Sequence, residues 1–523
     1  MHVVGGHVIY DAVPLEGTWE MAYRSNAWDS VECPTFIGVA VAKAVPGFWE
    51  DMVPALRKAG MKDEFRINPV YERVTLPVVK SAKCTTLPNI YGCFLYRRKF
   101  TLDAKLCRFG GRGAPALPSG GFIETALPSA YLAFDCVRNQ VHVWVNGKFV
   151  AFRQGFSTPF ELPISPDALH EGENEIVLAV SNNPNKGYNG ADVSGLTTRG
   201  LFESTGGIDG RLELRFARND LGDVYVTTAK DLKSFTVHVG MQFGHAGRVT
   251  LPSRQSSVGS SVPFDRKNED IEIGSYLISD SDGKVLAKGK AKGDFTLPTK
   301  GFAFWSPENP VRYTLTLTTP EGKYSQKFGI RRLVPDGERM RLNGVLAYLR
   351  GVTEHCYFAE TVHLPRDLAY YRTITAKRKK LGFNFVRFHT FVPPEEYLEA
   401  MDELGMLVHI ESPNFVTLDE YDAIIRFARK HPCVVAYCTG NETWIDATAE
   451  KYLESVAKMV CPDRFALHAD ERDAQCGVHG QARQGHGEQA VPARPIAHGE
   501  ARGVFRLLHV LPAWSGVLLF AER

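Results

Sequence analysis

One short segment combines a residue that could carry catalysis with the surroundings that catalysis requires. The apolar run at 434–438 leads directly into Gly440, Asn441 and Glu442. A continuous apolar run of this length is typical of a parallel strand that is buried on both faces. In β/α barrels the reactive groups sit at the carboxyl ends of such strands. The pattern therefore predicts that Glu442 is a carboxylic acid at an active-site mouth. The competing interpretation is a strand that leads into an ordinary polar loop, because an Asn-Glu pair alone is a weak motif.

Polar side chains also follow the other strands that the sequence predicts in this region. His355 follows the first strand, Arg387 and His389 end the second, Glu411 ends the third, and Trp444 lies just past Glu442. Residues at the carboxyl ends of neighbouring barrel strands face the same pocket. We therefore expect these side chains to line one site, although each histidine could equally be a hydrogen-bonded structural residue.

The elements that would position these residues alternate between short apolar runs and amphipathic segments. Strands are predicted at 348–352, 383–388, 406–410 and 434–438, and helices at 365–380, 393–404, 418–430 and 446–460. Four βα units in succession predict a parallel sheet, and their regular length favours a β/α barrel over a doubly wound sheet. No glycine-rich phosphate loop follows these strands, which removes nucleotide binding as the leading alternative.

Two regions with all-β patterns precede the βα units. Residues 1–220 contain short alternating strands, such as those at 131–135 and 141–145, and the second of these runs into Asn146-Gly147, a strong hairpin signal. This pattern predicts a β-sandwich. Residues 221–335, with strands at 234–239 and 313–317, have the length of an immunoglobulin-like sandwich. Loops are predicted at the Gly-, Ala- and Pro-rich segment 109–128 and the Ser-rich segment 253–268.

Composition excludes several classes of protein. The 523 residues are 44% hydrophobic and 23% charged, and 61 Lys and Arg against 59 Asp and Glu leave a formal charge of +2. This balance gives no electrostatic footprint for nucleic acid. No signal peptide or membrane-spanning run is recognisable, so a cytoplasmic location is expected. The 10 cysteines include no CxxC pair, and neither a disulfide framework, a metal site nor a cofactor is predicted. A homo-oligomeric assembly stays open.

Short motifs occur in a fixed order along the chain. They are LEGTW at 15–19, YRRKF at 96–100, VWVNG at 143–147, GI at 207–208, WSPENP at 305–310, FGIR at 328–331, LNG at 342–344, LRGV at 349–352, DELG at 402–405 and GNE at 440–442. Together, in this order and approximate spacing, they resemble glycoside hydrolase family 2, which contains β-galactosidases, β-glucuronidases and β-mannosidases. The resemblance implies a jelly-roll sugar-binding-type domain at 1–220, an immunoglobulin-like domain at 221–335 and a (β/α)8 TIM barrel that begins near residue 336.

The same resemblance implies retaining hydrolysis of a terminal, non-reducing β-D-glycoside, with Glu442 as the acid/base. Retention requires a proton donor and a second carboxylate about 5 Å away. By resemblance, Asn441 would hydrogen-bond the sugar hydroxyl beside the anomeric carbon. A β-galactoside is the expected substrate, as the commonest activity in the family, while glucuronides and mannosides stay open. The family's Arg-x-x-His-x-Pro pattern is one residue shorter here, in Arg387-Phe388-His389. Trp444 is predicted to stack on a sugar ring, with a plug of the barrel top as the alternative.

The βα pattern stops after residue 460. A barrel needs eight units, but only the N-terminal half fits at 336–460, and 461–523 shows no helical or strand period. From Met459 onward the chain contains no Lys, Asn, Thr or Tyr. We expect a shift of reading frame near Cys461 rather than a low-complexity tail, and hence loss of the nucleophile that the family carries on the seventh strand. An unclosed half barrel would expose a sheet edge and invite aggregation.

Two other functions remain as alternatives at this point. One is a non-catalytic carbohydrate-binding remnant that keeps the N-terminal sandwich. The other, a serine hydrolase, has little support because no Gly-x-Ser-x-Gly nucleophile elbow is present.

Overall fold

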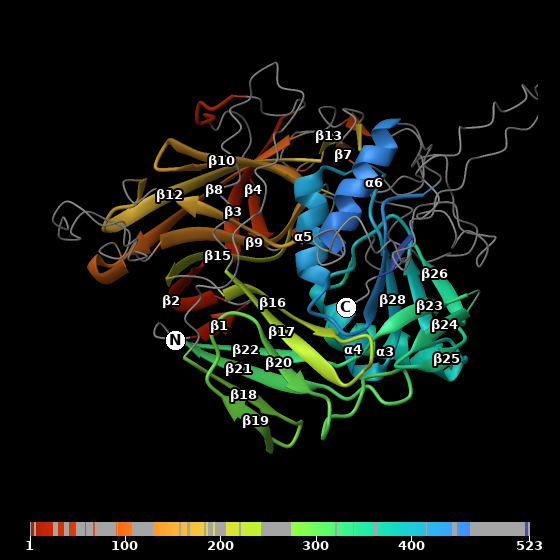
Figure 1. Cartoon of the computed structure of the whole chain (residues 1–523). Coiled ribbons are helices and arrows are strands. Elements are labelled where there is room, and N and C mark those ends of the chain that lie inside the picture. Colours follow the sequence, from red (N-terminus) through yellow and green to blue (C-terminus); the bar gives the residue numbers. More distant parts are fainter. Residues whose placement is uncertain are drawn as a thin grey trace, which may run out of the picture.

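A computed structural model gives the arrangement of the chain (Figure 1). It describes residues 2–4, 7–24, 30–35, 41–45, 47–48, 58, 66–67, 90–91, 93–106, 129–155, 158–164, 168–182, 185–186, 192–193, 206–218, 221–241, 274–319, 322–337, 339–356, 358, 364–414, 416–441, 447–460 and 518–520. The predicted loops at 109–128 and 253–268 lie outside these residues. The described elements form three groups in chain order, called here the N-terminal β-region, the middle β-region and the βα region.

The N-terminal β-region contains only strands among its named elements. These are β1 (His2–Val4), β2 (His7–Pro14), β3 (Gly17–Arg24), β4 (Val41–Val45), β5 (Gly47–Phe48), β6 (Arg66–Ile67), β7 (Ile90–Tyr91), β8 (Cys93–Leu102), β9 (Ser129–Val145), β10 (Lys148–Gly155), β11 (Phe160–Ile164), β12 (Gly172–Ser181), β13 (Asn185–Lys186), β14 (Asp192–Val193) and β15 (Gly207–Arg218). Eleven of them form one sheet in the order β1-β2-β15-β9-β12-β8-β3-β4, with β10 and β11 on β9 and β5 on β15. Alternate side chains of these strands form one apolar core.

The strand β9 corrects the prediction of two separate strands at 131–135 and 141–145. It is a single strand of 17 residues whose first half pairs with β11 and β15 and whose second half pairs with β10 and β12. The intervening residues 136–139 are buried, so a break into a solvated turn would expose them. The hairpin at Asn146-Gly147 is confirmed, because both residues have positive φ (49° and 76°), as a type I′ turn requires.

The middle β-region packs two small sheets around a second apolar core. Its strands are β16 (Leu221–Thr228), β17 (Ser234–Met241), β18 (Ser275–Ser279), β19 (Val285–Gly289), β20 (Phe295–Pro298), β21 (Tyr313–Thr319) and β22 (Gly322–Phe328). The sheet orders are β16-β17-β20 and β19-β18-β21-β22. A short antiparallel sheet of β23 (Leu333–Asp336), β24 (Arg339–Leu342) and β25 (Val345–Ala347) then leads to the βα region.

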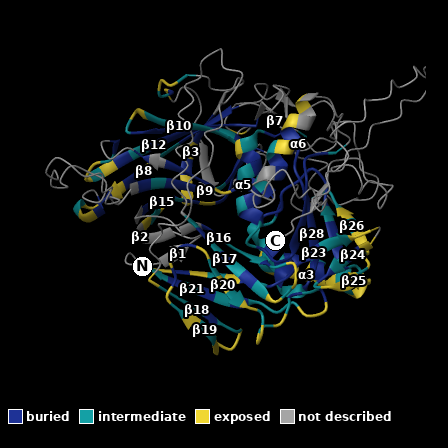
Figure 2. Ribbon diagram, viewed as in Figure 1, coloured by how far each residue is buried: buried dark blue, intermediate teal, exposed yellow. Residues whose placement is uncertain are grey.

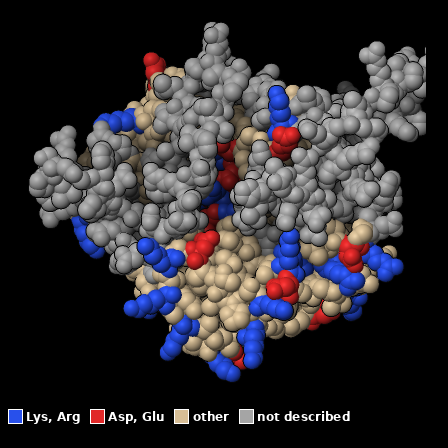
Figure 3. All heavy atoms as spheres, viewed as in Figure 1, with Lys and Arg blue, Asp and Glu red and all other residues tan. Residues whose placement is uncertain are grey.

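Lys and Arg side chains, with some acidic ones among them, are scattered over the middle β-region, in the lower part of the view in Figure 3. Lys284, Lys288 and Lys290 are exposed on and beside β19, which is the edge strand of its sheet. Lysines along an edge strand oppose pairing with the edge of another molecule. We therefore assign this charge to solubility and not to a binding site.

In the βα region, four parallel strands alternate with helices. The elements are β26 (Gly351–Glu354), α3 (Leu368–Lys380), β27 (Phe385–Phe388), α4 (Glu395–Leu404), β28 (Leu407–Glu411), α5 (Leu418–Ala428), β29 (Val434–Cys438) and α6 (Ala447–Val460). Every residue of β28 and β29 is buried (Figure 2), which explains their continuous apolar sequences. The predicted strand at 434–438 and the predicted helices are confirmed, with ends that shift by three residues or fewer.

Two predictions in this region need correction. The strand predicted at 348–352 is present but runs from Gly351 to Glu354, and Tyr348 is 78% exposed in the connection from β25. Residues 461–523 were expected to contain no strand, but Leu518–Phe520 forms β30, which pairs antiparallel with β29. A short apolar segment satisfies main-chain groups at the outer edge of β29, where a hydrogen-bond partner is needed. Among the described residues, no helix is long and apolar enough to cross a membrane.

Buried ion pairs join the N-terminal β-region to the βα region. Asp209 in β15, only 2% exposed, binds Arg138 in β9 at 3.3 Å and Arg366, ahead of α3, at 2.9 Å. The side chain of Glu420 in α5 binds Arg153 at the end of β10 at 3.1 Å and the hydroxyl of Thr158 at 3.2 Å. These contacts hold the N-terminal β-region against the βα region near the carboxyl ends of the parallel strands.

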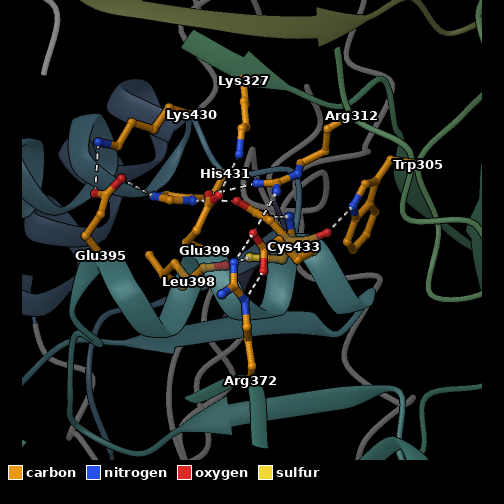
Figure 4. A network of polar contacts seen from close by, with 12 residues as sticks. Trp305, Arg312, Lys327, Arg372, Glu395, Leu398, Glu399, Lys430, His431 and Cys433 are labelled. Atoms are coloured by element: carbon orange, nitrogen blue, oxygen red, sulfur yellow. Dashed lines mark hydrogen bonds and ion pairs between the residues drawn. The ribbon is translucent and has the colours of Figure 1, made fainter. Parts of the chain in front are cut away.

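At the opposite end of the parallel strands, a polar network joins α4 to the middle β-region (Figure 4). The carboxylate of Asp402 accepts hydrogen bonds from His431 Nδ1 at 2.6 Å and from the backbone N–H of Cys433 at 2.8 Å. The indole of Trp305 donates to the Asp402 carbonyl at 3.0 Å. Burial alone would lower the pKa of His431, but the charges of Asp402 and Glu395 raise it to about 9.

This network predicts a specific loss of stability in alkali. Because the pKa of His431 in the folded protein, about 9, lies above its ordinary value of 6.5, the stabilisation is complete below that ordinary value. It is lost as the pH rises through about 9. We expect the free energy of unfolding, measured by urea titration, to fall across this range. His431→Gln should fall less steeply, and equal slopes for the two proteins would contradict the assignment.

Candidate active site

The carboxyl ends of the parallel strands bring together all the predicted site residues that the structure describes. His355 follows β26, Arg387 lies in β27 and His389 follows it, Glu411 ends β28, and Asn441 follows β29. Glu442 and Trp444 lie outside the described residues. The five described residues are linked by direct contacts and form one continuous cluster.

Glu411 is the centre of this cluster. Its side chain is 1% exposed, and its carboxylate accepts four hydrogen bonds. Arg387 donates from Nε and Nη2 to Oε2 at 3.1 and 2.7 Å, and Oε1 accepts from His389 Nδ1 at 2.7 Å and from the Thr390 backbone N–H at 3.0 Å. Burial would raise the pKa of Glu411, but the His389 hydrogen bond and the Arg387 charge together lower it. The residue is therefore an ionised internal anchor, with its acceptor capacity used inside the protein.

Arg387 also links Glu411 to the loop that follows β29. Its Nη2 also donates to the side-chain oxygen of Asn441, at 3.0 Å. With Oδ1 turned toward Arg387, the amide nitrogen of Asn441 faces away from the guanidinium. Asn441 is half-buried at the strand ends, and its amide nitrogen carries the two N–H donors of the side chain.

The two histidines stand edge to face, with ring centroids 4.6 Å apart. Because ionised Glu411 can only accept, His389 must carry a proton on Nδ1, which leaves Nε2 for another partner. Burial and the neighbouring His389 lower the pKa of His355. His355 is therefore neutral near pH 7, and can both donate and accept a hydrogen bond.

Sequence reasoning missed two residues of this cluster. Thr390 has a positive φ of 49°, which a β-branched residue rarely adopts, and this conformation turns its N–H to Glu411. The shortened spacing of Arg387 and His389 was a signal that this loop differs from the family pattern. Asn414 binds the main chain of Asn441 through both ends of its amide. Asn414 lies three residues after Glu411, where the sequence indicates only a loop.

Among the described residues, two groups of side chains have the residue types of a metal site, and both are occupied by internal contacts. In the first group, His409, Glu411 and Cys438, burial raises the pKa of the Cys438 thiol well above its ordinary value. The Glu411 oxygens already have four donors. The second group, Glu399, Asp402 and His431, is already satisfied by Arg312, Lys327 and internal hydrogen bonds.

Glu411→Gln tests the anchor. The variant keeps the side-chain size, but it removes the charge opposite Arg387 and points an amide N–H₂ at existing donors. Removal of one partner of a buried ion pair leaves an uncompensated charge, and we expect the free energy of unfolding at pH 7 to fall by about 3 kcal/mol. Because the Glu411 pKa is lowered in the folded protein, its stabilisation is present above the ordinary value of 4.5 and lost as the pH falls below it. The difference between the two proteins in urea unfolding should therefore shrink in acid.

Glu173→Gln is the matched control for this substitution. Glu173 pairs with Lys99 at 2.8 Å, but both side chains are 63% exposed. Exposed pairs contribute little, so we expect almost no change. An equally small loss for Glu411→Gln would contradict its role as an anchor.

Comparisons with known proteins show what this chain is similar to. Residues 122–206 match the family model for the sugar binding domain of glycosyl hydrolases family 2. A β-galactosidase of Enterobacter cloacae is 23% identical over 464 residues, which cover 82% of this chain and 40% of that protein. A β-galactosidase of Vibrio cholerae is 24% identical over 404 residues, covering 72% and 36%. The chain therefore spans about two fifths of the length of these curated relatives.

Solved structures show the same fold. A β-glucuronidase of an uncultured Clostridium sp. superposes with a TM-score of 0.59 at 18% identity, covering 86% of this chain and 71% of that one. A β-glucuronidase of Ruminococcus gnavus in complex with D-glucuronic acid gives 0.60 at 16% identity, covering 88% and 73%.

Proposed function

We propose that this chain, a member of glycoside hydrolase family 2, contributes to hydrolysis of terminal β-D-glycosides with retention of configuration. The observation that supports this most directly is the polar cluster at the carboxyl ends of β26–β29, where Arg387 binds the side chain of Asn441, the residue that precedes Glu442 in the sequence. Relatives that are β-galactosidases and β-glucuronidases support the same class of reaction.

In this proposal Glu442 is the general acid and base. It directly follows Asn441, whose side chain Arg387 holds and whose main chain Asn414 holds. A proton donor must reach the glycosidic oxygen while the sugar stays fixed, and small displacements of catalytic groups reduce rates strongly. Asn441 would fix the sugar through the hydroxyl beside the anomeric carbon, with its amide N–H donating to that oxygen.

The second carboxylate must come from elsewhere in the chain. Glu411 is buried and saturated with donors, and Glu354 at the end of β26 is bound by Arg378 and Tyr397. A nucleophile needs a free carboxylate oxygen that faces the anomeric carbon. Neither residue meets this requirement, so on this proposal the nucleophile is not among the described residues. The shift of reading frame expected near Cys461 would remove it from this chain, so the kinetic tests below use the chain with its reading frame restored.

A neutral sugar, with a β-galactoside as the first candidate, fits the described part of the site better than a uronate. The cation among the predicted site residues is Arg387, and its charge is already balanced by Glu411. Recognition of a sugar carboxylate needs a charged or bidentate partner. We therefore expect higher kcat/KM for a p-nitrophenyl β-D-galactoside than for the matching β-D-glucuronide, measured on the chain with its reading frame restored.

Glu442→Gln tests the acid/base role. We expect kcat on the galactoside to fall roughly 100- to 10,000-fold, the range of general acid–base catalysis. The loss should be larger for an alkyl glycoside than for a nitrophenyl glycoside, because a poor leaving group depends more on protonation. Rates on the two substrates, measured for wild type and variant, check this expectation.

Glu454→Gln is the control. Glu454 lies exposed on α6, so the same change of charge occurs on the helix that follows the site. It should leave kcat unchanged. Turnover by Glu442→Gln equal to that of this control would rule out Glu442 as the acid.

A second candidate function, carbohydrate binding without catalysis, is favoured by one observation. The family match covers the sugar binding domain at 122–206. Calorimetry of the full chain against a glycan panel would separate the two functions. Saturable binding without turnover, unchanged in Glu442→Gln and Asn441→Ala, would favour this candidate.

A further inference from the structure

We propose that Asn414 is a positioning residue that sets Asn441 for contact with the sugar hydroxyl beside the anomeric carbon. This inference rests on the proposed function and extends it to a residue outside the expected site. Asn414 does not itself need to touch the sugar. Its effect would pass through the main chain of Asn441.

The contact between the two residues is reciprocal. Asn414 Nδ2 donates to the carbonyl oxygen of Asn441 at 2.8 Å, and the Asn441 N–H donates to Asn414 Oδ1 at 2.7 Å. The last main-chain contacts between β28 and β29 are the pairing of Glu411 with Cys438 and the bond from Ser412 N–H to the Cys438 carbonyl at 2.9 Å. The Asn414 side chain therefore continues the strand pairing beyond its end, into the Asn441 loop.

Gly440 makes this close approach possible. Its φ is 143°, and a Cβ at this position would lie 2.2 Å from Asn414 Oδ1. Any other residue would displace the Asn414 amide from Asn441. The glycine that ends the apolar run and the asparagine 26 positions earlier thus form a single fitted contact.

Asn441 is held from two directions. Asn414, in the loop after β28, fixes both main-chain polar groups, while Arg387 in β27 binds the side-chain oxygen at 3.0 Å. With the backbone and Oδ1 both fixed, the direction of the amide N–H₂ is fixed as well. Loss of the Asn414 contact would free the peptide and let the Asn441 amide turn about its hydrogen bond to Arg387.

The chain contains a matched control for this contact. Asn384, at the other end of the same parallel sheet, donates to the Tyr348 carbonyl at 2.9 Å and accepts from the Arg350 N–H at 2.8 Å. It makes the same kind of double contact with a neighbouring loop, far from the strand ends that carry the site. Asn384→Ala should remove the same number of hydrogen bonds as Asn414→Ala. It should not change the binding of a sugar at the candidate site.

Calorimetry of the full chain tests the proposal. The probes are a galactose-configured iminosugar and its analogue that lacks the hydroxyl beside the anomeric position. Wild type should bind the hydroxylated probe about three- to tenfold more tightly, as expected for one net hydrogen bond. Asn441→Ala and Asn414→Ala should both lose this preference while affinity for the analogue stays the same. Asn384→Ala should keep the preference.

Each outcome decides between distinct conclusions. If Asn441→Ala loses the preference and Asn414→Ala keeps it, the positioning role is wrong although the proposed function stands. If wild type binds the two probes equally, Asn441 does not contact this hydroxyl and the inference is overturned. If wild type binds neither probe, the proposed function fails and the inference with it.

Asn414→Asp provides a second variant that does not depend on the stability of the alanine substitution. An aspartate can still accept from the Asn441 N–H, but it cannot donate to the Asn441 carbonyl. We expect an intermediate loss of preference. A folded Asn414→Asp protein with the full wild-type preference would overturn the role of the reciprocal contact.

Discussion

A buried carboxylate determines the arrangement of the site end of the parallel sheet. Glu411 is removed from water, and a buried charge of this kind is tolerated only where partners replace the lost hydration. Arg387, His389 and the Thr390 N–H supply these partners from the neighbouring strand and its loop. The left-handed backbone of Thr390, which is strained for a β-branched residue, follows from the same demand, since it directs an N–H to the anchor.

A buried hydrogen-bond network around a carboxylate lies at each end of the parallel strands. At one end Asp402, His431 and Cys433 form a network that fixes α4 to β29 and, through Trp305, to the middle β-region. At the other end Glu411 is held by Arg387 and His389, and Arg387 also binds the side chain of Asn441. The first network joins regions of the protein, whereas the second fixes side chains at the strand ends that carry the candidate site.

Much of the βα region could be predicted from sequence, because burial on both faces leaves a strong signal. The apolar run at 434–438 is strand β29, and the polar residues after each run do gather at one sheet edge. What the sequence could not give was the direction of each side chain. Glu411 was expected to line the pocket, but the donors around it turn it into an internal support. Asn414 was missed because an asparagine after a strand is usually a turn residue, and Tyr348 was assigned to a strand because aromatic residues favour strands.

The charge balance of the cluster bears on the chemistry that it could support. Arg387 and Glu411 neutralise each other, and His355 carries no charge near neutral pH because burial and His389 lower its pKa. An unpaired cation beside a carboxylic acid favours the ionised form and would work against proton donation. Arg387 holds the Asn441 side chain as a member of this neutral pair, so it adds no net positive charge next to the residue that follows Asn441. Under the proposed function, the contacts that hold Asn441 would therefore fix its geometry without lowering the pKa of a neighbouring acid.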